Sequence, residues 1–149
     1  YDQLVPEALK KLNPSAKVNV RPWVVEGKTL AEIEQSSKEV RGMGVDLVVV
    51  AVPAAADADT DDLYLRSYTW VMNNALSFSY QEWDCFVVLP SVTQAVSEGR
   101  QQQREALALQ IVKGQDLGYV ERQPGDATPA VDLLAQWFTQ QADAAKEVK

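Results

Sequence analysis

The fold of this chain is indicated by one apolar stretch, Asp46-Leu47-Val48-Val49-Val50-Ala51-Val52. Its β-branched residues favour a strand, and its lack of polar alternation is typical of a strand that helices cover on both faces. A second stretch of this kind is Trp83-Asp84-Cys85-Phe86-Val87-Val88-Leu89. Two such stretches predict the parallel sheet of an α/β protein.

Helical segments alternate with the predicted strands. Helices are expected at residues 2–12, 29–41, 62–80, 96–114 and 128–141, and two further strands at Lys17–Val25 and Gly118–Glu121. Thr29 and Glu32 form a capping box, and Thr128 is an expected N-cap before Pro129. This order predicts a single three-layer α/β domain over residues 1–141, followed by a frayed tail at 142–149. The opening helix lacks a preceding strand, so we expect the first strand of the sheet to be missing.

Composition narrows the range of functions. The chain has 149 residues, is 46% hydrophobic and carries a net charge of −7, which suits one domain with one core. No Lys/Arg cluster follows a helix face, so nucleic acid is not an expected partner. The longest apolar run, Val45–Ala58, is interrupted by charge and too short to span a membrane. Histidine is absent, so a Ser-His or Cys-His pair cannot form within this chain.

The order and spacing of these segments resemble the SGNH/GDSL hydrolases, a superfamily of esterases and acylhydrolases with a flavodoxin-like α/β fold. Trp23-Val24-Val25-Glu26-Gly27-Lys28-Thr29 resembles the family's second block, and Val45–Val52 resembles the strand that leads into its third. Pro124-Gly125-Asp126-Ala127-Thr128-Pro129 resembles the last block. The resemblance implies that the Gly27 amide serves an oxyanion hole and that Asp126 is the catalytic acid that orients the base.

The chain also departs from the family pattern. The block with the serine nucleophile would precede Tyr1, the Gly-x-Asn position has Pro53-Ala54-Ala55, and Pro129 stands in the place of the histidine. Two functions therefore follow from the resemblance. One is an SGNH-type ester hydrolase domain, or its C-terminal part, that is not catalytic on its own. The other is a catalytically silent SGNH-like module for binding or assembly.

The missing strand has a consequence for partners. In the family this strand lies centrally, so we expect an upstream segment or a partner chain to complete the sheet beside Asp46–Val52 or Val18–Val25. An ester or a carbohydrate is the ligand class implied, and no cofactor or metal is expected. Family members are often exported, but no signal segment is visible. The sequence therefore does not assign the chain to a cellular compartment.

Other residues have two interpretations each. Asp57, Asp59, Asp61 and Asp62 imitate the start of a calcium loop, but Asp62 replaces its glycine and Tyr68 its final glutamate. A solvated loop that caps the next helix is the better interpretation.

Ser91 at a strand end is a turn residue or a nucleophile, and Cys85 is a buried structural thiol or a reactive one. The four tryptophans serve packing or a sugar-stacking platform, for which Trp70 is the best candidate.

Overall fold

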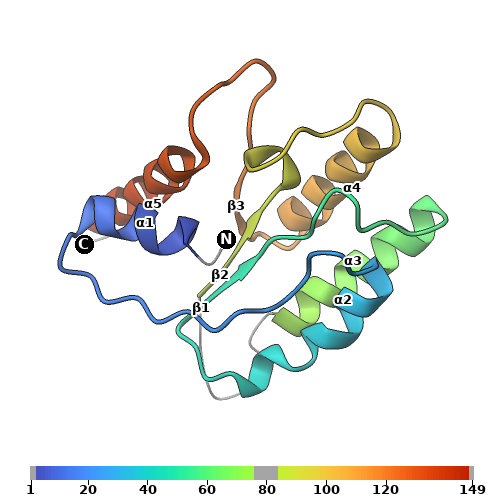
Figure 1. The fold of residues 1–149 in the computed structure, drawn as a ribbon, viewed down its shortest axis with the longest axis horizontal. Coiled ribbons are helices and arrows are strands. Elements are labelled where there is room, and N and C mark those ends of the chain that lie inside the picture. The colour runs from blue at the N-terminus through green and yellow to red at the C-terminus, as the bar shows by residue number, and fades with distance from the viewer. Residues whose placement is uncertain (1–2, 76–83, 148–149) are drawn as a thin grey trace. The chain divides into compact units, whose positions relative to one another are not determined.

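The computed structural model describes residues 3–75 and 84–147 (Figure 1). Helices and strands alternate along most of the chain. In chain order the elements are α1 (Leu4–Leu12), α2 (Leu30–Ser37), the 3₁₀ turn η1 (Val40–Gly42), β1 (Leu47–Val50), α3 (Asp61–Ala75), β2 (Asp84–Val88), the 3₁₀ turn η2 (Pro90–Val92), α4 (Arg100–Gly114), β3 (Gly118–Val120) and α5 (Ala130–Glu147).

The described strands form one parallel sheet in the order β1-β2-β3. Val48 is in register with Cys85, and Phe86 with Gly118. The pairing extends past the strand ends, because the Leu89 amide donates to the Val120 carbonyl at 3.0 Å. The α/β class with a parallel sheet, predicted from the apolar strands, is confirmed and is consistent with a flavodoxin-like fold.

The chain divides into two compact units. The sheet unit, Trp23–Glu121, contains β1 to β3 and the helices α2, α3 and α4. Helix α3 packs against both α2 and α4, so the three helices form one layer. Their apolar side chains make one core with the strands, which includes Leu30, Ile33, Val48, Val50, Tyr68, Val71, Met72, Val87, Ala108 and Val112.

The terminal unit combines Tyr1–Pro22 with Arg122–Lys149. Helices α1 and α5 pack against each other. An ion pair between Lys11 and Asp132 joins them at the surface. Helix α5 continues to Glu147, into the segment expected to be a tail.

The expected strand at Lys17–Val25 is wrong. Within the described chain this segment is not paired with any strand, and residues 17–24 make no backbone hydrogen bond. The side chains of Val20 and Val24 are exposed. The four valines between residues 18 and 25 give the segment β propensity, but propensity does not supply a partner strand, and Pro22 removes one donor.

The capping box of the second helix is confirmed, since the Glu32 amide donates to Thr29 Oγ1 at 3.2 Å and the Thr29 amide to Glu32 Oε1 at 3.2 Å. This helix ends at Ser37, earlier than the expected Arg41, and the 3₁₀ turn η1 follows it. Ser37 Oγ donates to the Glu34 carbonyl at 2.6 Å, a side-chain bond that competes with the helix ladder at its end.

Two helix starts also differ from expectation. Helix α4 begins at Arg100 rather than Val96, because Gly99 before it has φ +82°, which no helix accommodates. Helix α5 begins at Ala130, and the Pro129 carbonyl accepts its first backbone bond. Thr128 is therefore not the N-cap; its amide and hydroxyl both donate to Asp126. The expected end of α3 at Tyr80 and start of β2 at Trp83 lie outside the described residues.

Candidate functional site

The carboxyl ends of parallel strands are the usual place for a site in an open α/β sheet. In the sheet unit this edge is formed by the loop from Ala51 to Thr60 after β1 and by the segment that leads from β2 to α4. Two arginines of α4, Arg100 and Arg104, lie one helical turn apart and bind the loop after β1.

Arg104 is the centre of this arrangement. Its Nε donates to Asp57 Oδ1 at 2.6 Å, its Nη1 to Asp61 Oδ1, and its Nη2 to the Ala58 carbonyl at 3.2 Å. The Arg104 side chain is only 6% exposed. Its guanidinium also lies 5.2 Å from the centre of the Tyr64 ring, within the range of a cation–π contact.

Arg100 extends the same network at the surface. Its Nε donates to Asp57 Oδ2 at 2.5 Å and its Nη2 to the carbonyls of Ala58 and Asp59. Each carboxylate oxygen of Asp57 therefore accepts a hydrogen bond from an arginine. We call Asp57, Asp61, Arg100 and Arg104 the arginine clamp.

The electrostatics of the Asp57–Arg104 pair favour the charged form of each side chain. Partial burial by itself raises the pKa of Asp57, but hydrogen bonds from Arg104, the Ala58 amide and Arg100 outweigh it, and the pKa is lowered. For Arg104, burial acts to lower the pKa, and the bonds to Asp57 and Asp61 raise it above its ordinary value. Burial raises the pKa of Tyr64 far above the usual range. Asp57 and Arg104 thus stabilise each other's charged form.

The acidic loop serves the clamp and the start of α3. Thr60 Oγ1 accepts from the Leu63 amide at 3.1 Å, and Asp61 opens the helix, where negative charge is favourable. No three His, Cys, Asp or Glu side chains converge into a possible metal site anywhere in residues 3–75 and 84–147. The sequence interpretation did not predict a role for Arg100 and Arg104. Their i, i+4 spacing does indicate that both side chains lie on one face of the glutamine-rich helix.

Gly27 lies in an exposed turn of the sheet unit. The Lys28 amide donates to the Val25 carbonyl at 3.2 Å, and Gly27 at the third position of this β-turn has φ +73°. A positive φ at that position is the requirement of a type II turn and favours glycine. The Gly27 amide has no acceptor among the described residues, so it remains available to a ligand.

Asp126 lies in the terminal unit, so the structure gives no distance between it and Gly27 in the sheet unit. Its Oδ1 accepts from Thr128 Oγ1 at 2.6 Å and from the Thr128 amide at 2.9 Å. These two bonds lower the pKa of Asp126. The turn before it, Gln123-Pro124-Gly125-Asp126, closes through the Asp126 amide and the Gln123 carbonyl at 3.0 Å. Asp126 thus shapes the entry to α5.

Ser91 and Cys85 are both in the sheet unit. The Ser91 amide donates to Glu105 Oε1 at 2.8 Å, which ties η2 to α4. Cys85 on β2 is partly buried, and burial raises the pKa of its thiol to about 11. A thiol with this pKa is protonated at neutral pH, so the structure supports the structural interpretation of Cys85.

The described tryptophans do not share one environment. Trp23 Nε1 donates to Ser36 Oγ at 2.9 Å in a partly buried position, whereas Trp70 on α3 is 51% exposed. Trp137 meets Phe138 edge to face on α5. Trp83 lies outside the described residues. Among these three side chains Trp70 alone is exposed, whereas Trp23 and Trp137 are half-buried.

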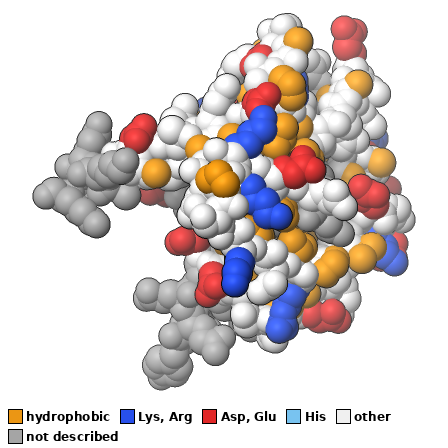
Figure 2. Space-filling model, turned by 60° about the vertical axis from the view of Figure 1, so that its left-hand side comes forward, with side chains coloured by type: hydrophobic (Ala, Val, Ile, Leu, Met, Phe, Trp, Pro, Cys, Tyr) orange, Lys and Arg blue, Asp and Glu red, His pale blue; other side chains and the backbone are white. Residues whose placement is uncertain are grey.

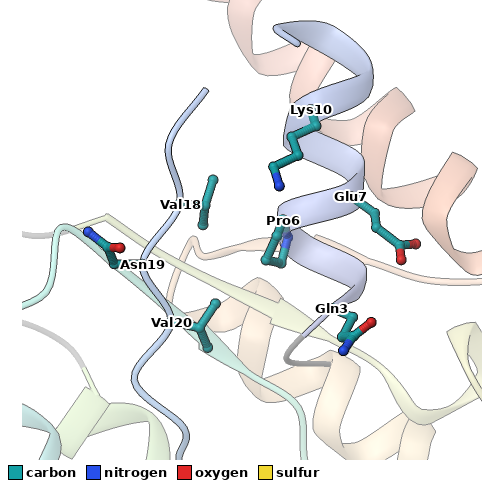
Figure 3. Close-up of a pocket in the computed structure, with 7 residues that line it drawn as sticks. All are labelled: Gln3, Pro6, Glu7, Lys10, Val18, Asn19 and Val20. Carbon is teal, nitrogen blue, oxygen red and sulfur yellow. The ribbon is translucent and has the colours of Figure 1, made fainter. Parts of the chain in front are cut away.

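The terminal unit has an open groove of about 510 Å³ (Figure 3). It lies between helix α1 and the extended segment that follows. Its lining residues are Gln3, Pro6, Glu7, Lys10, Val18, Asn19 and Val20. On the face drawn in Figure 2, Lys and Arg side chains are interspersed with Asp and Glu, and that face has no wholly basic surface.

None of the helices in the described chain is long and apolar enough to cross a membrane, as the interrupted run Val45–Ala58 predicts. Comparison with known proteins adds no relative: no protein-family model, no curated protein and no solved structure matches this chain.

Proposed function

We propose that this chain is a catalytically silent, SGNH-like α/β module that serves binding or assembly. The observation that carries the proposal is the arginine clamp at the carboxyl edge of the sheet. Asp57 and Asp61 are two of the four carboxylates between residues 57 and 62 at this edge, and both are ion-paired with Arg104.

The protonation states of nearby groups support the same proposal. A general base or acid works best when its pKa lies near the working pH. The pKa of Asp57 is lowered, that of Tyr64 is raised, and that of the Cys85 thiol is raised to about 11, so all three move away from neutrality. Histidine, the residue that would normally fill this role, is absent from the chain.

The second candidate is the ester hydrolase domain, or its C-terminal part, that the resemblance implies. One observation favours it: Gly27 is an exposed residue and its amide has no acceptor among the described residues, so the amide can serve as an oxyanion donor. In this function Asp126 orients a base, and both that base and the nucleophile come from outside the chain.

Hydrolysis of p-nitrophenyl acetate and butyrate separates the two functions. The chain is assayed alone and together with the upstream segment or partner chain that would supply the nucleophile and the base. Gly27→Val, Asp126→Ala and the conservative Asp126→Asn, each first shown to melt cooperatively, are assayed in the same two ways. The silent module predicts equal rates for all four proteins, at the level set by buffer and exposed side chains. Turnover that falls to background in both Gly27→Val and Asp126→Ala would establish the hydrolase instead.

A further inference from the structure

The groove of the terminal unit has one wall made of extended backbone. In Figure 3 the side chains of Val18 and Val20 extend from one side of this segment toward Pro6 of α1, and Asn19 points away. Such alternation is the geometry of a β-strand, in which successive side chains point to opposite faces. The groove therefore places the apolar side chains of Pro6, Val18 and Val20 together beside a strand-like segment.

The backbone of this segment is ready for pairing. Residues 17–22 make no backbone hydrogen bond within the described chain. In an extended segment the amides and carbonyls of residues 17, 19 and 21 share one edge, and Pro22 interrupts only the other edge, which has residues 18 and 20. The edge of Lys17, Asn19 and Arg21 thus keeps every donor and acceptor.

The charged side chains that line the groove are Glu7 and Lys10, and further basic residues stand beside it in sequence. Residues 3–22 contain one acidic side chain, Glu7, and four basic ones, Lys10, Lys11, Lys17 and Arg21. Lys10 points from α1 toward the segment, whereas the Glu7 carboxylate is on the other flank of the helix (Figure 3). Lys11 is paired with Asp132, but Lys10 has no ion pair in the described chain. A negatively charged ligand group complements Lys10.

We propose that this groove binds an extended acidic segment of another protein, which adds as a β-strand to the edge of Lys17, Asn19 and Arg21. Backbone pairing supplies affinity in this mode, and pockets for alternate side chains supply specificity. Apolar side chains of the partner contact Pro6, Val18 and Val20, and its carboxylate meets Lys10. The inference rests on the proposed binding function and names the partner of that module.

A displayed library of random dodecapeptides, selected on the whole chain, is the probe. We expect enriched sequences with apolar residues at alternate positions and an Asp or Glu. Fluorescent copies of these peptides are then titrated against Asn19→Pro, which removes one donor from the pairing edge, and against Asn19→Ala, which keeps it. Loss of one hydrogen bond predicts about fivefold or greater weakening in Asn19→Pro alone.

Two further measurements test the geometry. Lys10→Glu weakens binding more than Lys10→Arg, and the difference shrinks at high salt. Bound peptide slows hydrogen exchange at the amides of Lys17, Asn19 and Arg21. Equal binding to Asn19→Pro and wild type, or no enriched pattern, overturns the proposal. A dimer of this chain that Asn19→Pro dissociates also overturns it, because the occupant is then a second copy. Hydrolysis of the p-nitrophenyl esters would contradict the catalytically silent module. It would not change the result of the peptide titrations, which test the groove independently.

Discussion

Arg104 Nε lies 2.6 Å from Asp57 Oδ1, although 47 positions separate the two residues in the chain. This contact fastens the loop after β1 to helix α4, on the side of the sheet unit where the strands end. Arg104 is 6% exposed and Asp57 30% exposed, so the pair is largely removed from water. Each charge therefore depends on the other for its solvation.

Arg104→Met is expected to lower the free energy of unfolding by about 2 kcal/mol, because it leaves Asp57 and Asp61 without their buried partner. Arg100→Met is the matched control: the Arg100 side chain is 56% exposed, and exposed pairs contribute less than about 1 kcal/mol. Urea unfolding followed by circular dichroism measures both. Equal losses in the two variants would contradict the central role of Arg104.

The lowered pKa of Asp57 predicts a loss of stability in acid. A carboxylate with a depressed folded-state pKa contributes stability above its unfolded pKa of about 3.9, and this contribution is lost as pH falls through the folded pKa. Wild-type protein should therefore lose stability from about pH 5 downward, more steeply than Asp57→Asn. Thermal melts of both proteins between pH 2 and pH 7 measure the two slopes, and parallel curves would rule out this contribution.

The buried strands could be predicted from sequence because their signal is local. The runs that contain β1 and β2 are continuous and β-branched, and the Thr29–Glu32 capping box is complete within four residues. Lys17–Val25 has the same local signal, yet it forms no strand, because pairing depends on a partner that sequence-local propensity does not contain. The predicted start of helix α4 was wrong because the backbone conformation of a single glycine, Gly99, determines it.

The candidate site was less predictable than the sheet. Gly27 and Asp126 were chosen by resemblance, and the structure places both in turns with local roles. The arginine clamp was missed because its contacts join residues more than 40 positions apart. The positions of Asp57 and Asp61 indicated a charged loop, but not which cations would neutralise it.

Cys85 is expected to react slowly with iodoacetamide in the folded protein. Because burial raises its thiol pKa to about 11, the thiolate fraction at pH 8 is roughly two-hundredfold below that of an unperturbed cysteine with a pKa of about 8.5. Mass spectrometry of alkylation at pH 8, with and without 8 M urea (roughly the unfolding limit for a small domain), gives the ratio of rates. Comparable rates in both conditions would mean that the thiol is accessible and ionised in the folded state.

Gly27→Ala is expected to destabilise the sheet unit by about 1 kcal/mol through backbone strain alone. A Cβ at Gly27 meets no atom within 4 Å, so a steric clash makes no contribution, but φ +73° is unfavourable for alanine. Gly27→Asn should cost less, because asparagine tolerates this region better. Gly42→Ala is the control, since its added Cβ also meets nothing within 4 Å and its φ is not positive. Chemical denaturation should rank the variants as Gly42→Ala, Gly27→Asn, Gly27→Ala in order of increasing loss. If Gly27→Ala is as stable as Gly42→Ala, the turn does not require glycine, and a ligand-binding role becomes the better explanation of that residue.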